Sequence, residues 1–478
     1  MFGLELDLGL SILLILSLLA ACAFEFINGF HDTANAVATV IYTRSLKPRT
    51  AVVWSGIWNF IGVNVGGITV AMSIVNLLPT EILVDKNVYH SIAMIFSLIL
   101  TAIIWNLGTW YFGIPCSSSH TLIGSIFGVG MAYMFITPEG TINLNWDKVV
   151  DMGLSLLISP FFGFSFAILL MLIFLKTIKK KKFFVQPDTL KKTPFWIRLT
   201  LIFTCTGISF SHGSNDGQKG IGLVMIILIS ILPTYYAIDT QKNPTNMIGN
   251  LTQIETYMHR LDSLSLVNNV NVKTKENIAS INANIDTLKG IISMSSGVNG
   301  VPKESRFETR KCIISISKQT DKLIKSDENL FTGSILSEKE TKHLKSNVKE
   351  LNSYTEFAPW WVVLMISLSL GIGTMVGWKR IVVTIGEKIG KSHLSYAQGA
   401  SAEIVGASTI IASTYLGLPV STTHVLSSGI AGSMVATGGK KNLQYGTIKN
   451  IAIAWIVTIP VTILLSAGLF LFFRLFVK

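Results

Sequence analysis

Charged side chains are scarce in this chain. They make up 14% of its 478 residues, while hydrophobic residues make up 50%, a balance too apolar for a soluble enzyme of this length. Cysteine is also rare. The four thiols, at Cys22, Cys116, Cys205 and Cys312, have no metal-ligand spacing and support no disulfide framework. The composition therefore argues against a soluble enzyme, and the cysteine spacing argues against a cysteine-based metal centre.

Long apolar runs are present instead. Most reach or exceed the roughly 20 residues that a helix needs to cross a bilayer core. They cover residues 8–27, 51–77, 91–112, 149–175, 197–236, 360–378, 396–416 and 447–473. The first run lacks a basic start and a small-residue cleavage site, so we interpret it as a retained span and not as a signal peptide. The sequence predicts an all-α polytopic membrane protein.

The net charge of +12 is concentrated in a few places. Basic residues crowd four short connections, at residues 44–49, 176–198, 379–391 and 440–449, while the opposite loops hold few. This asymmetry is typical of the cytoplasmic face of a membrane protein and accounts for the charge better than nucleic-acid binding does. We expect a multi-pass protein of the inner membrane with both termini outside.

The alternation of sides fits two halves of opposite orientation, an inverted-topology repeat with broken helices and half-helices as in many secondary transporters. Residues 1–175 form the N-terminal membrane repeat, and residues 176–195 form a basic cytoplasmic linker. The C-terminal repeat takes residues 196–238 and 357–478. Between these parts lies a polar insert, residues 239–356, which we expect to be a small, mainly helical domain outside the membrane, with no ligand site of its own.

A cluster of proline, three hydroxyl residues and histidine occurs twice, at residues 115–120 and 419–424. Unpaired polar groups are costly in lipid, so the cluster suits the lining of a substrate cavity. In each copy the proline ends one helix, and Ser117 or Ser421 is a good N-cap for a half-helix. The expected substrate-binding residues are Ser117, Ser118, Ser119, Thr121, Ser421, Thr422 and Thr423. His120 and His424 support them or simply orient the turn.

A second repeated element, at residues 28–35 and 212–219, places aspartate within apolar stretches longer than one ordinary span. We expect Gly29 and Gly213 to loosen the helix there. An ionised aspartate at the bilayer centre costs about 2.5–3.5 kcal/mol, so it is usually functional; the alternative is an aspartate that only caps a broken helix. The residues expected to couple cations or protons are Asp32, Asn35, Asn215, Asp216 and Lys219, supported by Asn28 and His31.

These parts together describe a symmetric pocket for a small oxyanion. Half-helix N-termini attract oxyanions through unpaired backbone N–H groups and a partial positive charge, and the hydroxyls add neutral donors. Carboxylate and amide oxygens suit a hard cation or a proton. Because no basic clamp is present, the anion needs co-bound cations or Lys219 to offset its charge.

At these residues the chain resembles the inorganic phosphate transporter (Pit) family, and within it the bacterial low-affinity, proton-coupled branch. The similar segments are residues 28–39, 211–222, 371–378, 385–390 and 419–428. The resemblance implies uptake of phosphate across the inner membrane by proton symport, either as the free anion or as a neutral complex with a divalent metal. It implies no cofactor and no fixed metal; a homodimer is one possible assembly.

The chain departs from the sodium-coupled relatives at two places. His31 stands where the first asparagine of their motif is expected, and Gln218–Lys219 replaces alanine–asparagine in the second copy. A lysine at a sodium ligand's position can hold a fixed positive charge in place of the ion. We therefore expect one sodium site to be lost and transport to be coupled to protons.

Other functions fit parts of the same pattern. A sodium-coupled phosphate permease or a sulfate permease would use a similar pocket, although sulfate cannot donate a hydrogen bond to Asp32 or Asp216 at neutral pH. A passive anion channel differs in lacking concentrative uptake. An intramembrane serine hydrolase needs one nucleophile, yet the hydroxyl cluster occurs twice, so we expect a transporter and not an enzyme.

Overall fold

The computed structural model describes residues 6–85, 87–138, 144, 146–187, 193–265, 272–294, 300–326 and 336–477, without the side chains of 33–35, 147, 148, 264, 265, 272, 294 and 326. Within these ranges the chain forms helices and no strand, as the sequence predicts. It divides into two compact units. Unit 1 comprises Met1–Ser230 and Ala358–Lys478, and unit 2 comprises Ile231–Phe357.

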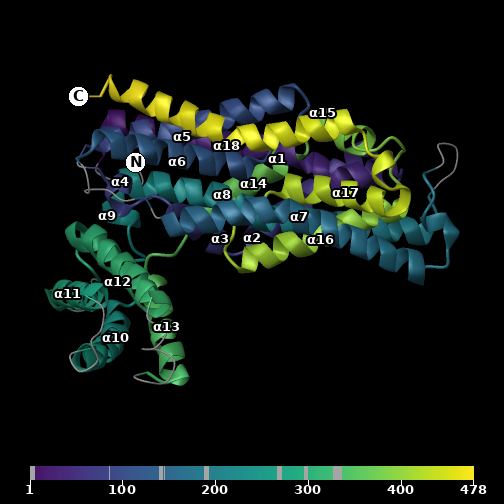
Figure 1. Ribbon diagram of the computed structural model, residues 1–478. Coiled ribbons are helices and arrows are strands. Elements are labelled where there is room, and N and C mark those ends of the chain that lie inside the picture. Colours follow the sequence, from purple (N-terminus) through teal and green to yellow (C-terminus); the bar gives the residue numbers. More distant parts are fainter. Residues whose placement is uncertain are drawn as a thin grey trace. The chain divides into compact units, whose positions relative to one another are not determined.

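Unit 1 is a helical bundle (Figure 1). Its first half contains α1 (Leu8–Tyr42), α2 (Pro48–Val65), α3 (Thr69–Val75), α4 (Thr80–Leu83), α5 (Val88–Tyr111), α6 (Ser118–Ile136), α7 (Trp146–Thr177) and the short η1 (Lys181–Phe183). Its second half contains α8 (Phe195–Ile231), α14 (Trp360–Thr374), α15 (Lys379–Val383), the π-helical η5 (Thr384–Lys388), α16 (Tyr396–Tyr415), α17 (Thr422–Gly438), η6 (Lys440–Asn442) and α18 (Tyr445–Arg474).

Many of these helices are long and apolar enough to cross a membrane. Among the described residues five single helices qualify, and up to seven spans result if the bent pairs α2–α3 and α14–α15–η5 each count as one. The pairs bend by 72° and 56°. Both bends contain a glycine with positive φ, Gly67 at 76° and Gly377 at 72°, a conformation that other residues adopt only with strain. The predicted multi-pass helical architecture is confirmed.

The two halves of unit 1 present the same order of parts: a very long helix, a bent pair, a span, a hydroxyl-capped helix and a closing span. α1 begins and α18 ends at the same end of the bundle, at the left of Figure 1. At the other end one hydrophobic cluster joins parts of three basic connections, through Phe183, Ile385 and Leu443. The inverted repeat and the side of the membrane on which the termini lie remain predictions.

The helices that carry the aspartates are continuous, so the expected loosening at Gly29 and Gly213 is wrong. These glycines allow close packing instead. A Cβ atom on Gly29 would lie 2.5 Å from the Leu370 carbonyl oxygen of α14, and one on Gly213 would lie 2.2 Å from the Asn59 carbonyl oxygen of α2. The breaks in the membrane helices fall instead in the bent pairs α2–α3 and α14–α15–η5.

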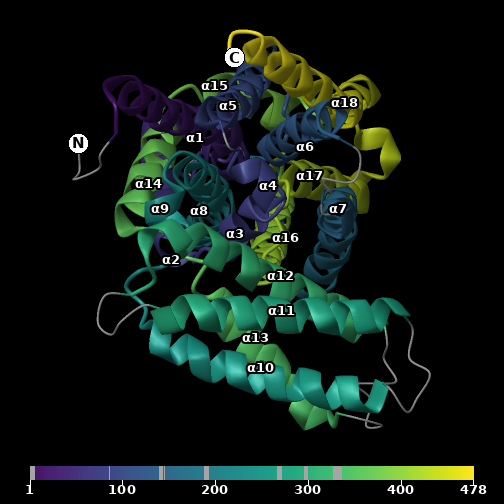
Figure 2. The same cartoon turned by 90° about the vertical axis from the view of Figure 1, so that its left-hand side faces the viewer.

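Unit 2 is a separate helical module with its own core. It contains α9 (Pro233–Tyr236), α10 (Pro244–Ser265), α11 (Val272–Met294), η3 (Lys303–Ser305), α12 (Arg306–Ser326) and α13 (Glu338–Asn352). Figure 2 shows α10 and α11 side by side within this module, and they pack with α12 and α13. Leucine and isoleucine residues at helical spacing fill the core between them.

The two ends of unit 2 are joined by Arg310, a fully buried residue of α12. Its Nη1 donates to the carbonyl oxygen of Ala237 at 3.1 Å, where the chain enters the module, and to that of Thr355 at 2.8 Å, where it leaves. Burial lowers the pKa of the guanidinium to about 10, which keeps it charged at neutral pH. The Arg310 side chain thus fixes the segments by which the chain enters and leaves unit 2 to each other.

Replacing Gly213 by alanine tests the close packing of α8 on α2. We expect Gly213→Ala to destabilise the protein by about 1–3 kcal/mol, because the added methyl group collides with backbone that cannot move aside cheaply. Gly207 on the same helix is the matched control, since a Cβ there would lie 3.8 Å from its nearest neighbour. Thermal unfolding of the detergent-solubilised variants measures both, and equal melting temperatures would contradict the packing argument.

Candidate functional site

The two aspartates of the repeated element meet in the interior of unit 1. Asp32 projects from α1 and Asp216 from α8, and both are buried. Ser118, the first residue of α6, lies between them. Its hydroxyl donates to Asp32 Oδ2 at 3.0 Å and lies 3.5 Å from Asp216 Oδ2. Residues far apart in the sequence therefore form one polar centre.

The start of α17 supplies the second pair of hydroxyls. Thr423 Oγ1 donates to Asp32 Oδ1 at 2.6 Å, and Thr422 Oγ1 donates to Asp216 Oδ2 at 3.5 Å. Each carboxylate thus contacts hydroxyls from both half-helices. The contacts satisfy part of the hydrogen-bonding capacity that each buried carboxylate carries.

Lys219 supplies the positive charge of this centre. Its Nζ lies 2.8 Å from Asp216 Oδ2, one turn away on α8, and it donates to Ser118 Oγ at 3.3 Å. The lysine side chain is 1% exposed, which makes the partner essential, because an unpaired ammonium group in an apolar interior is very costly. Asp216 Oδ1 has no partner among the described residues.

Two histidines flank the aspartates. His31 Nδ1 lies 3.2 Å from Asp32 Oδ1, and its Nε2 lies 3.3 Å from Thr109 Oγ1 of α5. His212 Nδ1 contacts Asn59 Oδ1 at 2.8 Å, and its Nε2 lies 3.4 Å from Asp216 Oδ2. His212 was not among the site residues predicted from the sequence. Its spacing of four residues before Asp216, which puts both on one helix face, was the available signal.

The hydroxyl clusters begin new helices with serine N-caps, as predicted. Ser117 caps α6 and accepts from the backbone N–H of His120 at 3.2 Å, and Ser421 caps α17 and accepts from that of His424 at 3.1 Å. Both helices therefore point their N-termini, with their partial positive charge, at the carboxylate centre. Ser119 Oγ donates to the Val420 carbonyl oxygen at 2.6 Å, which joins the two starts.

Several other predicted site residues lie beside this centre and bond elsewhere. Ser117 and Ser421 use their hydroxyls as caps, and Thr121 Oγ1 donates to the Ser117 carbonyl oxygen at 2.9 Å. Asn215 Nδ2 donates to Thr414 Oγ1 at 3.0 Å. Local sequence cannot separate such residues from Ser118, because which hydroxyl of a capped start faces the centre depends on how α6 packs.

The residues predicted to support the site make different kinds of contact. The rings of His120 and His424 lie 4.5 Å apart, and His424 stacks on Trp455 at 3.8 Å. This places them behind the half-helix starts. Asn28 donates to Glu25, a residue that the sequence analysis also missed. The side chain of Asn35 lies outside the described residues.

A cation could be held at the same centre. Asp32, His212 and Asp216 offer ligand atoms that all lie within 4.8 Å of one another. Two carboxylates and an imidazole fit a divalent transition metal, and carboxylates alone suit magnesium. The donor set is therefore compatible with a cation that enters together with an anion.

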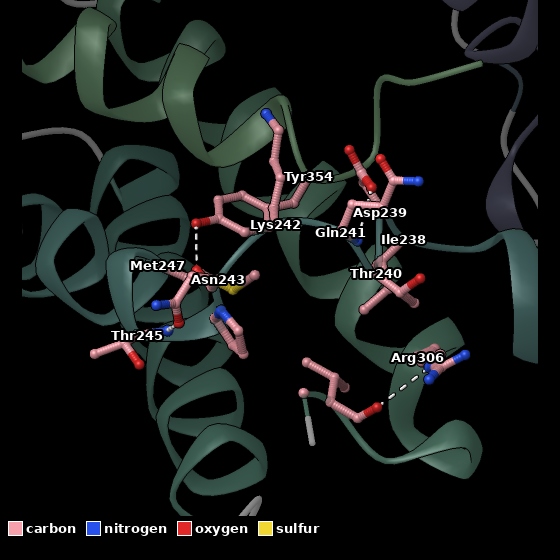
Figure 3. A pocket seen from close by; sticks show the side chains of 13 residues that line it. Ile238, Asp239, Thr240, Gln241, Lys242, Asn243, Thr245, Met247, Arg306 and Tyr354 are labelled. Atoms are coloured by element: carbon pink, nitrogen blue, oxygen red, sulfur yellow. Dashed lines mark hydrogen bonds between the residues drawn. The ribbon is translucent and has the colours of Figure 1, made fainter. Parts of the chain in front are cut away.

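A cavity of about 480 Å³ lies within unit 2 (Figure 3). Its charged residues already have partners. Arg306 Nη1 donates to the Thr234 carbonyl oxygen at 2.9 Å, and Lys242 Nζ donates to Ser353 Oγ at 2.5 Å. Asp239 Oδ1 accepts from the backbone N–H of Gln241 at 3.0 Å. The cavity is polar, but its charged groups serve the fold, and we assign no ligand to it.

Comparison with known proteins gives consistent matches over nearly the whole chain. The model of the phosphate transporter family matches residues 28–466. The low-affinity inorganic phosphate transporter of Buchnera aphidicola subsp. Acyrthosiphon pisum is 42% identical, over 97% of each chain. PitA of Escherichia coli strain K12, also named a low-affinity inorganic phosphate transporter, is 41% identical over the same shares. A solved sodium-dependent phosphate transporter superposes with a TM-score of 0.55 at 20% identity, over 97% of this chain and 99% of its own, which shows a shared fold.

The buried ion pair gives a prediction that needs no substrate. Lys219→Met leaves Asp216 without its cation, and breaking a buried pair from one side costs about 3–5 kcal/mol. The double variant Asp216→Asn, Lys219→Met removes both charges and should melt above Lys219→Met alone. Lys379→Met, at the exposed start of α15, is the control and should melt like the wild type. If the two substitutions destabilise additively, Lys219 and Asp216 do not form a pair.

Proposed function

Since the chain belongs to the phosphate transporter family, we propose that it imports inorganic phosphate across the inner membrane by proton symport. The family and the relatives are transporters, so the alternative of an intramembrane serine hydrolase is wrong. We propose in addition which ion is coupled to transport, in which form the substrate binds and which residues bind it.

The observation that carries the proposal is the centre formed by Asp32, Ser118, Asp216 and Lys219. Hydroxyl donors and two helix N-termini surround it, which suits an oxyanion. The carboxylates suit an anion that can itself donate, because hydrogen phosphate keeps a proton at neutral pH and sulfate does not. The site therefore favours phosphate over sulfate.

Lys219 supports coupling to protons. Its ammonium group lies 2.8 Å from Asp216 Oδ2. It therefore occupies the place from which a sodium ion would bind that same oxygen. A fixed cation there cannot be exchanged between the two sides of the membrane. Transport then needs another mobile positive charge, and the proton is the natural one.

The substrate can enter as a neutral complex with a divalent metal. The ligand atoms of Asp32, His212 and Asp216 would contact the metal, while the hydroxyls of Ser118, Thr422 and Thr423 would contact the phosphate oxygens. In this form the metal offsets the charge of the anion beside two carboxylates. The complex is cargo, and the protein keeps no resident metal.

The test is uptake of radiolabelled phosphate into proteoliposomes that hold an alkaline interior, without sodium. We expect accumulation above the outside concentration, driven by the pH gradient and insensitive to excess sulfate. Omitting magnesium separates the two forms of substrate, since loss of uptake would identify the complex. Accumulation only after sodium is added would overturn proton coupling, and competition by sulfate would overturn the substrate assignment.

Substitutions in the centre should distinguish the role of its two aspartates from the role of Ser118. Asp32→Asn and Asp216→Asn are expected to reduce uptake to the level of liposomes without protein. Ser118→Ala removes the hydroxyl that donates to Asp32 and accepts from Lys219. It should raise the apparent KM about tenfold, equivalent to about 1–2 kcal/mol.

Ser125→Ala is the matched control for Ser118→Ala, because Ser125 lies buried in the same helix and, among the described residues, its hydroxyl bonds only the Thr121 carbonyl oxygen. Its uptake should equal that of the wild type. Correct insertion is checked for each variant. Near-normal uptake by either aspartate variant would contradict the assigned role of the centre.

A further inference from the structure

Glu25 of α1 is a buried carboxyl group that the centre described above does not use. Its residue is 0% exposed. Oε1 accepts a hydrogen bond from Asn28 Nδ2 at 3.1 Å, but Oε2 has no partner among the described residues. A buried carboxyl oxygen without a donor is costly if ionised, and such groups usually have a functional reason.

Glu25 lies on the same face of α1 as Asp32. Glu25, Asn28 and Asp32 follow one another at spacings of three and four residues, which places them on one face. At 1.5 Å per residue, Glu25 lies about 10 Å from Asp32 along the helix axis. Glu25 is thus nearer than Asp32 to the N-terminal end of α1, which is the end of the bundle where α18 also ends (Figure 1).

A glycine of α8 makes room for this carboxyl. A Cβ atom on Gly220 would lie 3.0 Å from Glu25 Cδ, so a side chain there would displace the carboxyl group. Gly220 directly follows Lys219. Ile366 of α14 packs at the same point, which leaves this side of the carboxyl apolar.

The electrostatic surroundings of Glu25 come from two helices. Lys219 and Asp216 of α8 act on its charge, as does Asp32 of α1, and Glu25 in turn acts on the thiol of Cys22. The described part of α14 has no titratable residue. In the register that aligns Gly29 with Gly213, the position in α8 that matches Glu25 is Ser209, whose hydroxyl lies 2.8 Å from Ser55 Oγ. The second half therefore has no matching carboxyl.

We propose that Glu25 carries the transported proton, on Oε2, while phosphate occupies the centre. The inference rests on the proposed function. With Glu25 ionised, three carboxylates would oppose the single ammonium of Lys219 before any anion arrives. Protonation removes one of these negative charges, so proton binding and anion binding favour each other, and by linkage each strengthens the other equally. No bond other than the O–H bond forms or breaks.

Glu25→Gln keeps the shape and the neutral state and removes the exchangeable proton. We expect pH-gradient-driven accumulation to fall by about tenfold or more, within the range of ordinary coupling energies. Phosphate self-exchange, at equal pH and equal phosphate on both sides, needs no net proton movement and should continue near the wild-type rate. That exchange should also lose its dependence on pH, and Glu25→Asp should restore part of the accumulation.

Glu403 of α16 gives a matched control. It is also fully buried, with Oε2 bonded to Thr204 and Oε1 without a described partner, and it makes no described contact with the centre. Glu403→Gln should leave accumulation and exchange unchanged.

Three outcomes would overturn the inference. Accumulation by Glu25→Gln at the wild-type level shows that the proton travels elsewhere. Loss of both accumulation and exchange shows that Glu25 serves binding or folding and not proton coupling. Failure of the wild type itself to accumulate phosphate under the pH gradient overturns the proposed function, and is distinguished by appearing before any substitution is made.

Discussion

One buried ammonium group next to two carboxylates organises the membrane unit. A lysine taken out of water must have a partner in place, and Lys219 finds it in Asp216 and in the hydroxyl of Ser118. Ser118 is also bonded to Asp32. This requirement brings α1, α6 and α8 to one point, and Thr423 adds α17. The close packing of α1 on α14 at Gly29, and of α8 on α2 at Gly213, then sets how closely α14 and α2 approach this point.

The sequence predicted those features that depend on local chemistry. The helical class follows from the apolar runs, and the starts of α6 and α17 follow from a proline and a serine cap. Features that depend on packing were out of reach. Gly29 and Gly213 look like helix breakers in the sequence, and only the neighbouring backbone shows that they permit contact. The same limit separates Ser118, which faces the carboxylates, from Ser117, which only caps.

Unit 2 was predictable as a helical insert because its apolar residues recur at helical spacing. Its cohesion was not, since the guanidinium of Arg310 links carbonyl oxygens that lie 118 residues apart in the chain, at Ala237 and Thr355. A buried arginine that bonds only backbone groups has no sequence signature. It holds the insertion points together, so the module can interrupt the second half of unit 1 without spreading its two ends.

The head-to-head arrangement of α6 and α17 has an energetic consequence. Their starts are joined by the hydrogen bond from Ser119 to the Val420 carbonyl oxygen. The rings of His120 and His424, behind these starts, are 4.5 Å apart. Each start has a partial positive charge of about half an elementary charge, and the carboxylates of Asp32 and Asp216 lie against both starts and offset their mutual repulsion. Protonating either carboxylate therefore weakens the attraction that holds the two starts together. The junction of α6 and α17 thus depends on the charge of the two aspartates.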